Sequence, residues 1–153
     1  RPHEIQFGIL KRLRGAPISR HTKNYGLIFD SSPPYTILAT DRIDFNAMQR
    51  LIRFARYWDL VANSGRFKSL LPVVLANAPF ARFLALSDWL YAKTDATHRI
   101  SPERLSGLLN EWLGSMNQEN AADIAASTKL NSSTGKADRA NAGTQRQQRH
   151  QAA

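Results

Sequence analysis

The sequence contains no cysteine, and this absence excludes several kinds of site at once. Without a thiolate the chain can form no disulfide, no zinc site with sulfur ligands and no iron–sulfur cluster of the usual kind. Four histidines are present, and none lies at metal-ligand spacing from another histidine or a carboxylate: His3, His21, His98 and His150. We therefore expect no metal site and no catalytic residue in this chain, and the sequence assigns no cofactor-binding residue.

Aromatic residues are absent after Trp112, and the last 23 residues contain no Val, Ile, Leu or Met. Such a segment buries too little apolar surface to offset the entropy of ordering, so the sequence predicts a disordered, polar and basic tail over 119–153. No apolar run approaches the roughly 18 residues of a membrane span, and no signal peptide is visible. The default expectations are a cytoplasmic location and no membrane partner.

Basic residues are abundant. The chain carries 21 Lys and Arg against 12 Asp and Glu, a net charge of +9 and a sequence pI of about 10.5. This balance favours an anionic partner, with an anionic substrate and nucleic acid as the two candidates. Only two local basic groups form: Lys11, Arg12 and Arg14, and then Arg50, Arg53 and Arg56. The second group is more typical of a solvated helix face than of a phosphate track.

The sequence predicts a mostly extended conformation for the N-terminal third of the chain. Residues 5–10 are apolar on both sides of an alternating pattern, which predicts a strand buried on both faces. A short helix is expected after Pro17 and ends at Gly26, which can supply a left-handed cap. Residues 27–29 and 35–40 are then extended, and the two pieces are candidates to pair as a small ribbon.

The rest of the chain shows helical periodicity. Asp44 is a predicted N-cap for the first long helix, and Asn63-Ser64-Gly65 is its predicted end. Its predicted buried face carries Phe45, Met48, Leu51, Ile52, Ala55, Trp58 and Val61. Further helices are predicted over 67–75, over 79–93 and from Ser101-Pro102 to Met116. Asp41 and Asp44 are spaced as a conceivable acid/base pair, although a turn and an N-cap explain them more simply.

Two stretches together resemble a known family. Residues 5–11 (IQFGILK) and 13–17 (LRGAP) resemble the closing strand of the partial (β/α)₆ barrel of radical SAM enzymes. Further blocks resemble the C-terminal domain of unknown function that follows this barrel in cobalamin-binding radical SAM proteins: Tyr25-Gly26, Pro33-Pro34-Tyr35 with Ile37-Leu38-Ala39-Thr40, and Asn63-Ser64-Gly65-Arg66-Phe67. Ala16 departs from the Thr usual in the family, and Ala62 from an expected Tyr. The CxxxCxxC cluster motif is absent from the chain.

The resemblance implies a domain plan and a set of cofactors for the parent protein. Residues 1–24 would be the last barrel strand and its exit loop, 25–118 a helical C-terminal domain, and 119–153 the tail. The parent would use a [4Fe–4S] cluster and S-adenosylmethionine, with cobalamin as a candidate third cofactor, none of them bound by this chain alone. Lys11, Arg12 and Arg14 would lie near the mouth of the barrel and face an anionic substrate; the alternative is that they are solvated loop charges.

The predicted fold class is therefore mainly α. An N-terminal strand left from a partial α/β barrel and a short extended pair precede a bundle of about four helices and the tail.

Three functions are compatible with this predicted fold class. The first is the accessory C-terminal portion of a cobalamin-dependent radical SAM enzyme, not competent for catalysis without its upstream domains. The second is a stand-alone nucleic-acid-binding module that uses the Arg50, Arg53 and Arg56 face and the tail. The third is a structural or interaction domain in which the helix over 102–116 docks on a partner.

Overall fold

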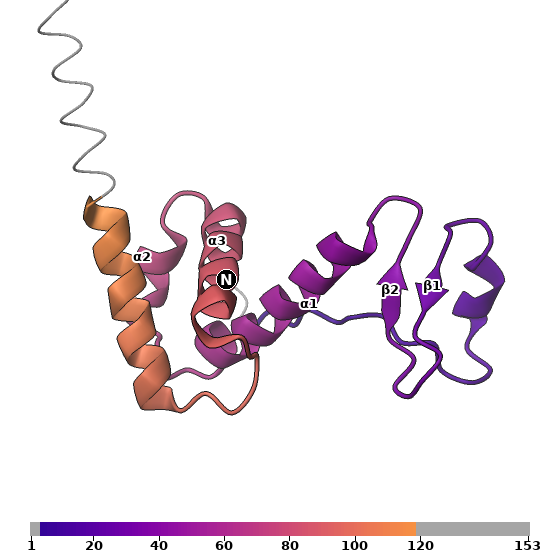
Figure 1. Ribbon diagram of the computed structural model, residues 1–153, viewed down its shortest axis with the longest axis horizontal. Helices are drawn as coiled ribbons and strands as arrows, with labels where there is room; N and C mark the ends of the chain where they lie inside the picture. The colour runs from indigo at the N-terminus through magenta and orange to yellow at the C-terminus, as the bar shows by residue number, and fades with distance from the viewer. Residues whose placement is uncertain (1–3, 119–153) are drawn as a thin grey trace, which may run out of the picture. The chain divides into compact units, whose positions relative to one another are not determined.

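The computed structural model describes residues 4–118, and within them the protein is mainly helical (Figure 1). The elements are η1 (Pro17–His21), β1 (Ile28–Phe29), β2 (Ile37–Ala39), α1 (Phe45–Trp58), η2 (Asp59–Asn63), α2 (Leu71–Leu75) and α3 (Pro79–Thr94), followed by a helix over residues 102–118. The predicted fold class is confirmed in this range. The predicted tail over 119–153 lies outside the described residues.

The chain divides into two compact units, residues 1–109 and 110–153. The first unit holds the ribbon, α1, η2, α2 and α3, and the helix over 102–118 begins in it. None of the helices in residues 4–118 is both long enough and apolar enough to cross a membrane.

β1 and β2 pair as the predicted two-stranded antiparallel ribbon, with Ile28 opposite Ala39 and an irregular register at Phe29. The connecting turn begins at Asp30, whose Oδ1 accepts a hydrogen bond from the backbone N–H of Ser32 at 2.8 Å. Gly26 has φ of +55°, as predicted for a left-handed position after the short helix, and a Cβ there would lie 3.1 Å from the backbone nitrogen of Asp41. Glycine is therefore favoured at this position both by the backbone conformation and by the limited space.

The predicted N-terminal strand is not formed in this chain. Residues 5–10 have no strand assignment, and the segment joins the ribbon only where Lys11 makes an isolated antiparallel bridge with Thr36. Ile5 and Phe7 are 44% and 42% exposed, so the expectation of burial on both faces was also wrong here. A strand buried on both faces needs a sheet neighbour on each side, and the described residues offer only the edge of β2.

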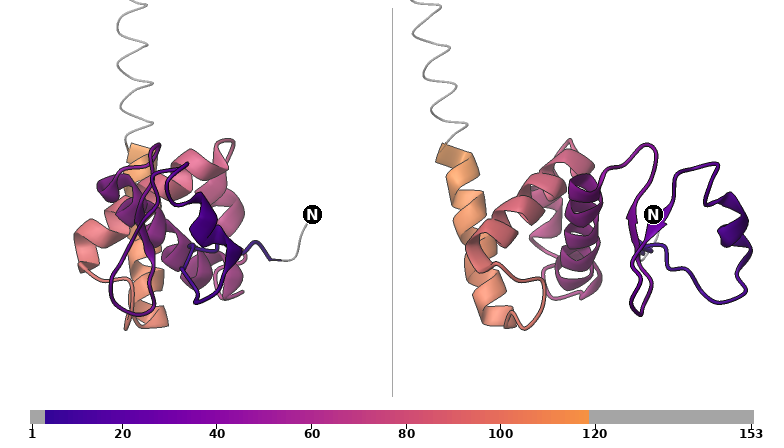
Figure 2. Two further views of the ribbon diagram at one scale, coloured as in Figure 1. Left: turned by 90° about the vertical axis from the view of Figure 1, so that its right-hand side faces the viewer. Right: turned by 45° about the vertical axis from the view of Figure 1, so that its right-hand side comes forward.

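Helix α1 begins as predicted: Asp44 caps it by accepting the N–H of Ala47 at 2.8 Å. Its buried face was predicted only in part. Phe54 and Tyr57 are buried, whereas Phe45 is 53% exposed. The difference arises because α1 has neighbours on more than one side: it packs against α3, which Figures 1 and 2 show beside it, and it also contacts β2.

The remaining helix boundaries follow local signals. The last turn of α1 widens into the π-helical segment η2, and Gly65 with φ of +74° follows, close to the predicted end. Prolines stand in the first turns of α2 and α3, where their missing N–H costs no helical hydrogen bond. Ser101 Oγ accepts the N–H of Arg104 at 3.2 Å, which confirms the predicted start of the last helix. That helix buries Leu105, Leu109 and Trp112.

Candidate functional site

The first unit contains a pocket with a basic lining, which we call the basic pocket. It has a volume of about 500 Å³ and is lined by Arg12, Leu13, Arg14, Gly15, Ser19 and Tyr35. Two of the three residues predicted to face an anionic substrate, Arg12 and Arg14, are therefore brought together. Lys11 is not among the lining residues.

The backbone around the basic pocket is held by hydrogen bonds to the ribbon. Arg12 N–H donates to the carbonyl of Tyr35 at 3.0 Å, and Leu10 accepts from Ile37 N–H at 2.9 Å. A turn then closes at Leu13, whose carbonyl accepts from Ala16 N–H at 3.1 Å, with Gly15 at φ of +77°. These bonds fix the two arginine Cα positions relative to Tyr35.

The side chain of Arg12 also has a defined support. Its guanidinium carbon lies 5.6 Å from the ring centroid of Phe29 on β1, in a cation–π arrangement. Stacking uses the face of the guanidinium and leaves the N–H donors on its edge available. Sequence reasoning missed Ser19 and Tyr35 as pocket residues, because their approach to Arg12 depends on the ribbon pairing and on the turn at Gly15.

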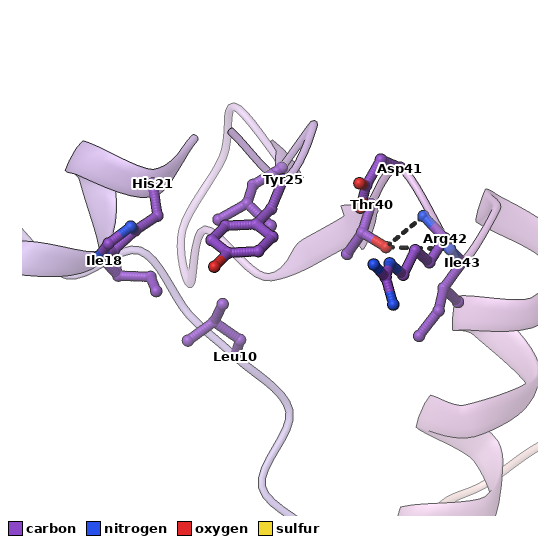
Figure 3. Close-up of a pocket in the computed structure, with 9 residues that line it drawn as sticks. Leu10, Ile18, His21, Tyr25, Thr40, Asp41, Arg42 and Ile43 are labelled. Atoms are coloured by element: carbon purple, nitrogen blue, oxygen red, sulfur yellow. Dashed lines mark hydrogen bonds between the residues drawn. The ribbon is translucent and has the colours of Figure 1, made fainter. Parts of the chain in front are cut away.

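A second hollow of about 510 Å³ adjoins the ribbon and has mostly apolar walls (Figure 3). Leu10, Ile18 and Ile43 contribute aliphatic side chains, and the Tyr25 ring lies 5.9 Å from the ring of His21. Its floor is shaped by Thr40, whose Oγ1 accepts the N–H groups of Arg42 and Ile43 at 3.1 and 3.0 Å. This hollow suits an apolar side chain better than a charged ligand.

Asp41 takes part in a turn beside this hollow, since its N–H donates to the carbonyl of Tyr25 at 3.0 Å. Asp44 is the N-cap of α1. Asp44 therefore has the N-cap role, and Asp41 the place in a turn, that the sequence favoured over an acid/base pair. Among residues 4–118 no group of three or more His, Asp or Glu side chains could hold a metal ion.

The arginine row of α1 has partners on α3 and in the segment that follows it, although Arg50 and Arg56 remain exposed. Arg50 Nε donates to Asp88 Oδ2 at 2.7 Å, Arg53 stacks 4.5 Å from the Tyr91 ring centroid, and Arg56 Nε donates to the carbonyl of Thr97 at 3.3 Å. The partners advance along α3 as the arginines advance along α1, so these two helices run in the same direction. The predicted solvated face is confirmed for Arg50 and Arg56, which are exposed, whereas Arg53 is half-buried beside the Tyr91 ring. The nucleic-acid hypothesis needs these same three arginine side chains to bind phosphate groups.

Tyr57 is a buried residue of α1 that also contacts the end of α3. Its ring is fully buried, and its hydroxyl donates to the carbonyl of Ala96 at 2.7 Å and lies 3.2 Å from Thr94 Oγ1. Burial raises the pKa of the Tyr57 phenol, because the phenolate is poorly solvated there, and the hydrogen bond with Thr94 partly offsets the rise. The phenol therefore stays protonated to higher pH in the folded protein than in the unfolded chain.

An aromatic cluster anchors the N-terminal segment to the helices. The Phe7 ring meets Phe54 and Trp58 edge to face, with centroids 5.1 and 5.3 Å apart, and Phe83 packs 4.8 Å from Trp58. Asn63 Nδ2 adds a polar tie by donating to the carbonyl of Ile5 at 3.0 Å. The Asn63-Ser64-Gly65 block, which carried part of the family resemblance, thus holds the segment that resembles a barrel strand.

The fold and these sites define a mainly helical protein with a small ribbon and no recognisable catalytic centre in the described residues. The model of the DUF4080 family, which is described as a protein of unknown function, matches residues 23–135. The chain belongs to this family. The match includes Tyr35 and the whole of α1 to α3, but it begins after Arg12, Arg14 and Ser19. No curated protein and no solved structure matches the chain.

Proposed function

We propose that this chain is the C-terminal accessory portion of a cobalamin-dependent radical SAM enzyme. The observation that carries the proposal is the order of two sequence signals. Residues 5–17 resemble the closing strand of the radical SAM barrel, and a match to a family of unknown function begins at residue 23. A domain of unknown function in this position is what the resemblance led us to expect.

The exposed N-terminal segment supports the same proposal. Ile5, Phe7 and Leu10 are between 38% and 44% exposed although the segment is apolar on both sides. A neighbouring barrel strand would supply backbone hydrogen bonds to such a segment and cover its apolar side chains. In the proposed enzyme, residues 5–10 complete the barrel.

The role that we propose for the helical part is to brace that last strand. Phe7 packs on Phe54 and Trp58 of α1, and Asn63 bonds the carbonyl of Ile5. These contacts connect the strand segment directly to the helical core, so a shift of the strand would disturb the packing of α1. Arg12 and Arg14 follow immediately, at the exit of the proposed strand.

The reaction itself belongs to the upstream domains of the proposed enzyme. A [4Fe–4S] cluster bound there would supply the electron for reductive cleavage of S-adenosylmethionine, and cobalamin is a candidate methyl carrier. This chain contributes none of the cluster ligands, since it has no cysteine. Its partners are then its own upstream domains and an anionic substrate, and its location is the cytoplasm.

The direct biochemical test uses the complete gene product, expressed and reconstituted with iron and sulfide without oxygen. We expect reduced protein to convert S-adenosylmethionine to 5′-deoxyadenosine, and substitution of the cluster cysteines to abolish the product. In the same protein, Phe7→Ala should lower the rate while leaving cluster absorbance unchanged, whereas the matched change Phe45→Ala, at an exposed position of α1, should leave the rate unchanged. A complete product that forms no 5′-deoxyadenosine contradicts the proposal.

A further inference from the structure

We propose that the basic pocket binds an oxyanion, a phosphate or carboxylate group of a small ligand, through the guanidinium groups of Arg12 and Arg14. The inference rests on the proposed function for the role of this anion as substrate, and it is tested on this chain alone, so that its failure is distinguishable from a failure of the radical SAM proposal. It also adds to the family match, which begins after both arginines.

The chemistry of the lining supports an anion. Two guanidinium groups and the hydroxyl groups of Ser19 and Tyr35 border a space of about 500 Å³, and no acidic side chain is among the lining residues. Arginine presents several N–H donors in a planar fork that matches the two oxygens of a carboxylate or phosphate edge. Asp30, in the ribbon turn, is not among the lining residues, and its Oδ1 accepts the N–H of Ser32.

The positive charges of Arg12 and Arg14 are also not neutralised by an ion pair within residues 4–118. An ion pair in the described residues joins Arg50 and Asp88, far along the sequence from the pocket. Arg12 is instead supported by the Phe29 ring, which holds the guanidinium in place without neutralising its charge. An arginine pair with exposed positions and without a carboxylate partner attracts an anionic ligand from solution.

The backbone gives the site a fixed frame. Arg12 is tied to Tyr35 by a backbone hydrogen bond of 3.0 Å, and Arg14 lies in the turn closed by the Ala16 to Leu13 bond. A ligand therefore meets two arginines on an anchored segment. This lowers the entropy cost of binding compared with arginines on a free chain.

The structure also supplies a matched control. Lys11 is adjacent in sequence and carries the same charge, yet it does not line the pocket and is instead in a bridge with Thr36 on the neighbouring strand. A pocket that binds through directed guanidinium contacts should distinguish Arg12 and Arg14 from Lys11. Attraction by local net charge alone should not.

The test measures binding of inorganic phosphate, pyrophosphate and citrate to the 153-residue chain by isothermal titration and by shifts of the arginine Nε–H signals in NMR spectra. We expect saturable binding that weakens as salt rises, and a loss of about tenfold or more in Arg12→Gln and in Arg14→Gln. Lys11→Gln should stay within about threefold of the parent, as expected for the loss of one screened charge. The ratio of phosphate to citrate affinity identifies which oxyanion the site prefers.

Two outcomes overturn the proposal. One is the absence of saturable binding of all three anions at low salt. The other is an equal loss of affinity in Lys11→Gln and in the two arginine variants, which would indicate attraction by net charge. Thermal unfolding of each variant verifies that the fold is kept, and Arg12→Lys tests geometry: a variant that keeps the charge but loses the planar fork should bind more weakly than the parent. Neither outcome bears on the radical SAM proposal, which depends on the upstream domains.

Discussion

The hydroxyl of Tyr57 offers a sharp test of how α1 is held to the end of α3. The substitution Tyr57→Phe keeps the buried ring and removes one hydrogen bond of 2.7 Å to the carbonyl of Ala96. That carbonyl also lies 2.9 Å from Thr94 Oγ1, whose single proton can turn to it from the Leu90 carbonyl at 2.8 Å when Tyr57 no longer donates. We therefore expect the free energy of unfolding to fall by about 1 kcal/mol, the net value of one hydrogen bond, and not by the larger cost of an orphaned buried acceptor.

The pH dependence of the stability change caused by Tyr57→Phe gives a second, independent test. Burial raises the pKa of Tyr57 in the folded state, so above about pH 10 the unfolded chain loses a phenol proton that the folded protein retains. The contribution of the Tyr57 hydroxyl to the free energy of unfolding is fully present below the pKa that Tyr57 has in the unfolded chain. It is lost as the pH rises through the higher pKa that Tyr57 has in the folded protein. The difference between parent and Tyr57→Phe should accordingly shrink with rising pH.

The assay is urea unfolding followed by tryptophan fluorescence at pH 8 and at several values above pH 10. Tyr25→Phe is the matched control, since Tyr25 is 53% exposed and should change stability little at either pH. A Tyr57→Phe protein as stable as the parent at pH 8, or a difference that stays constant above pH 10, would refute the account of this buried hydroxyl. Adding Thr94→Val to Tyr57→Phe should cost more than the sum of the single changes, because Ala96 then loses both donors.

Other predictions address the ribbon and the helix seam. Gly26→Ala should destabilise the protein by about 1 kcal/mol or more in urea unfolding, because it places a Cβ at positive φ and 3.1 Å from Asp41 nitrogen; unchanged stability would contradict the described turn. Asp88→Asn should cost at most about 1 kcal/mol and less at high salt, since the Arg50 pair is partly exposed, so a larger loss that salt does not alter would be inconsistent with this pair. Phe7→Ala should change the Trp58 fluorescence and lower the midpoint of thermal unfolding, and an unchanged spectrum would show that the segment is not anchored there.

The elements that the sequence predicted well are those set by neighbouring residues. The Asp44 cap needs only the N–H of Ala47, three residues on, and the Ser101 cap needs only Arg104. Gly26 likewise adopts the predicted positive φ. Such short-range interactions can be predicted from a single sequence because both partners lie within one turn of the chain.

The features that the sequence missed depend on partners far along the chain. Residues 5–10 have a strand pattern, but a strand forms only with neighbours, and here β2 reaches just the end of the segment. The partners of the arginine row were also missed, because Asp88 and Tyr91 lie almost 40 residues along the chain from Arg50 and Arg53. In the basic pocket, the pattern indicated Arg12 and Arg14, but only the ribbon pairing could bring Tyr35 to them and direct Lys11 elsewhere.

The measurement that tests the central claim most directly is the DNA sequence immediately upstream of the codon for Arg1. We predict a continuous reading frame that encodes a CxxxCxxC motif and the earlier strands of a barrel. A stop codon close upstream, with no such motif in frame, would contradict the claim that this chain is part of a radical SAM enzyme.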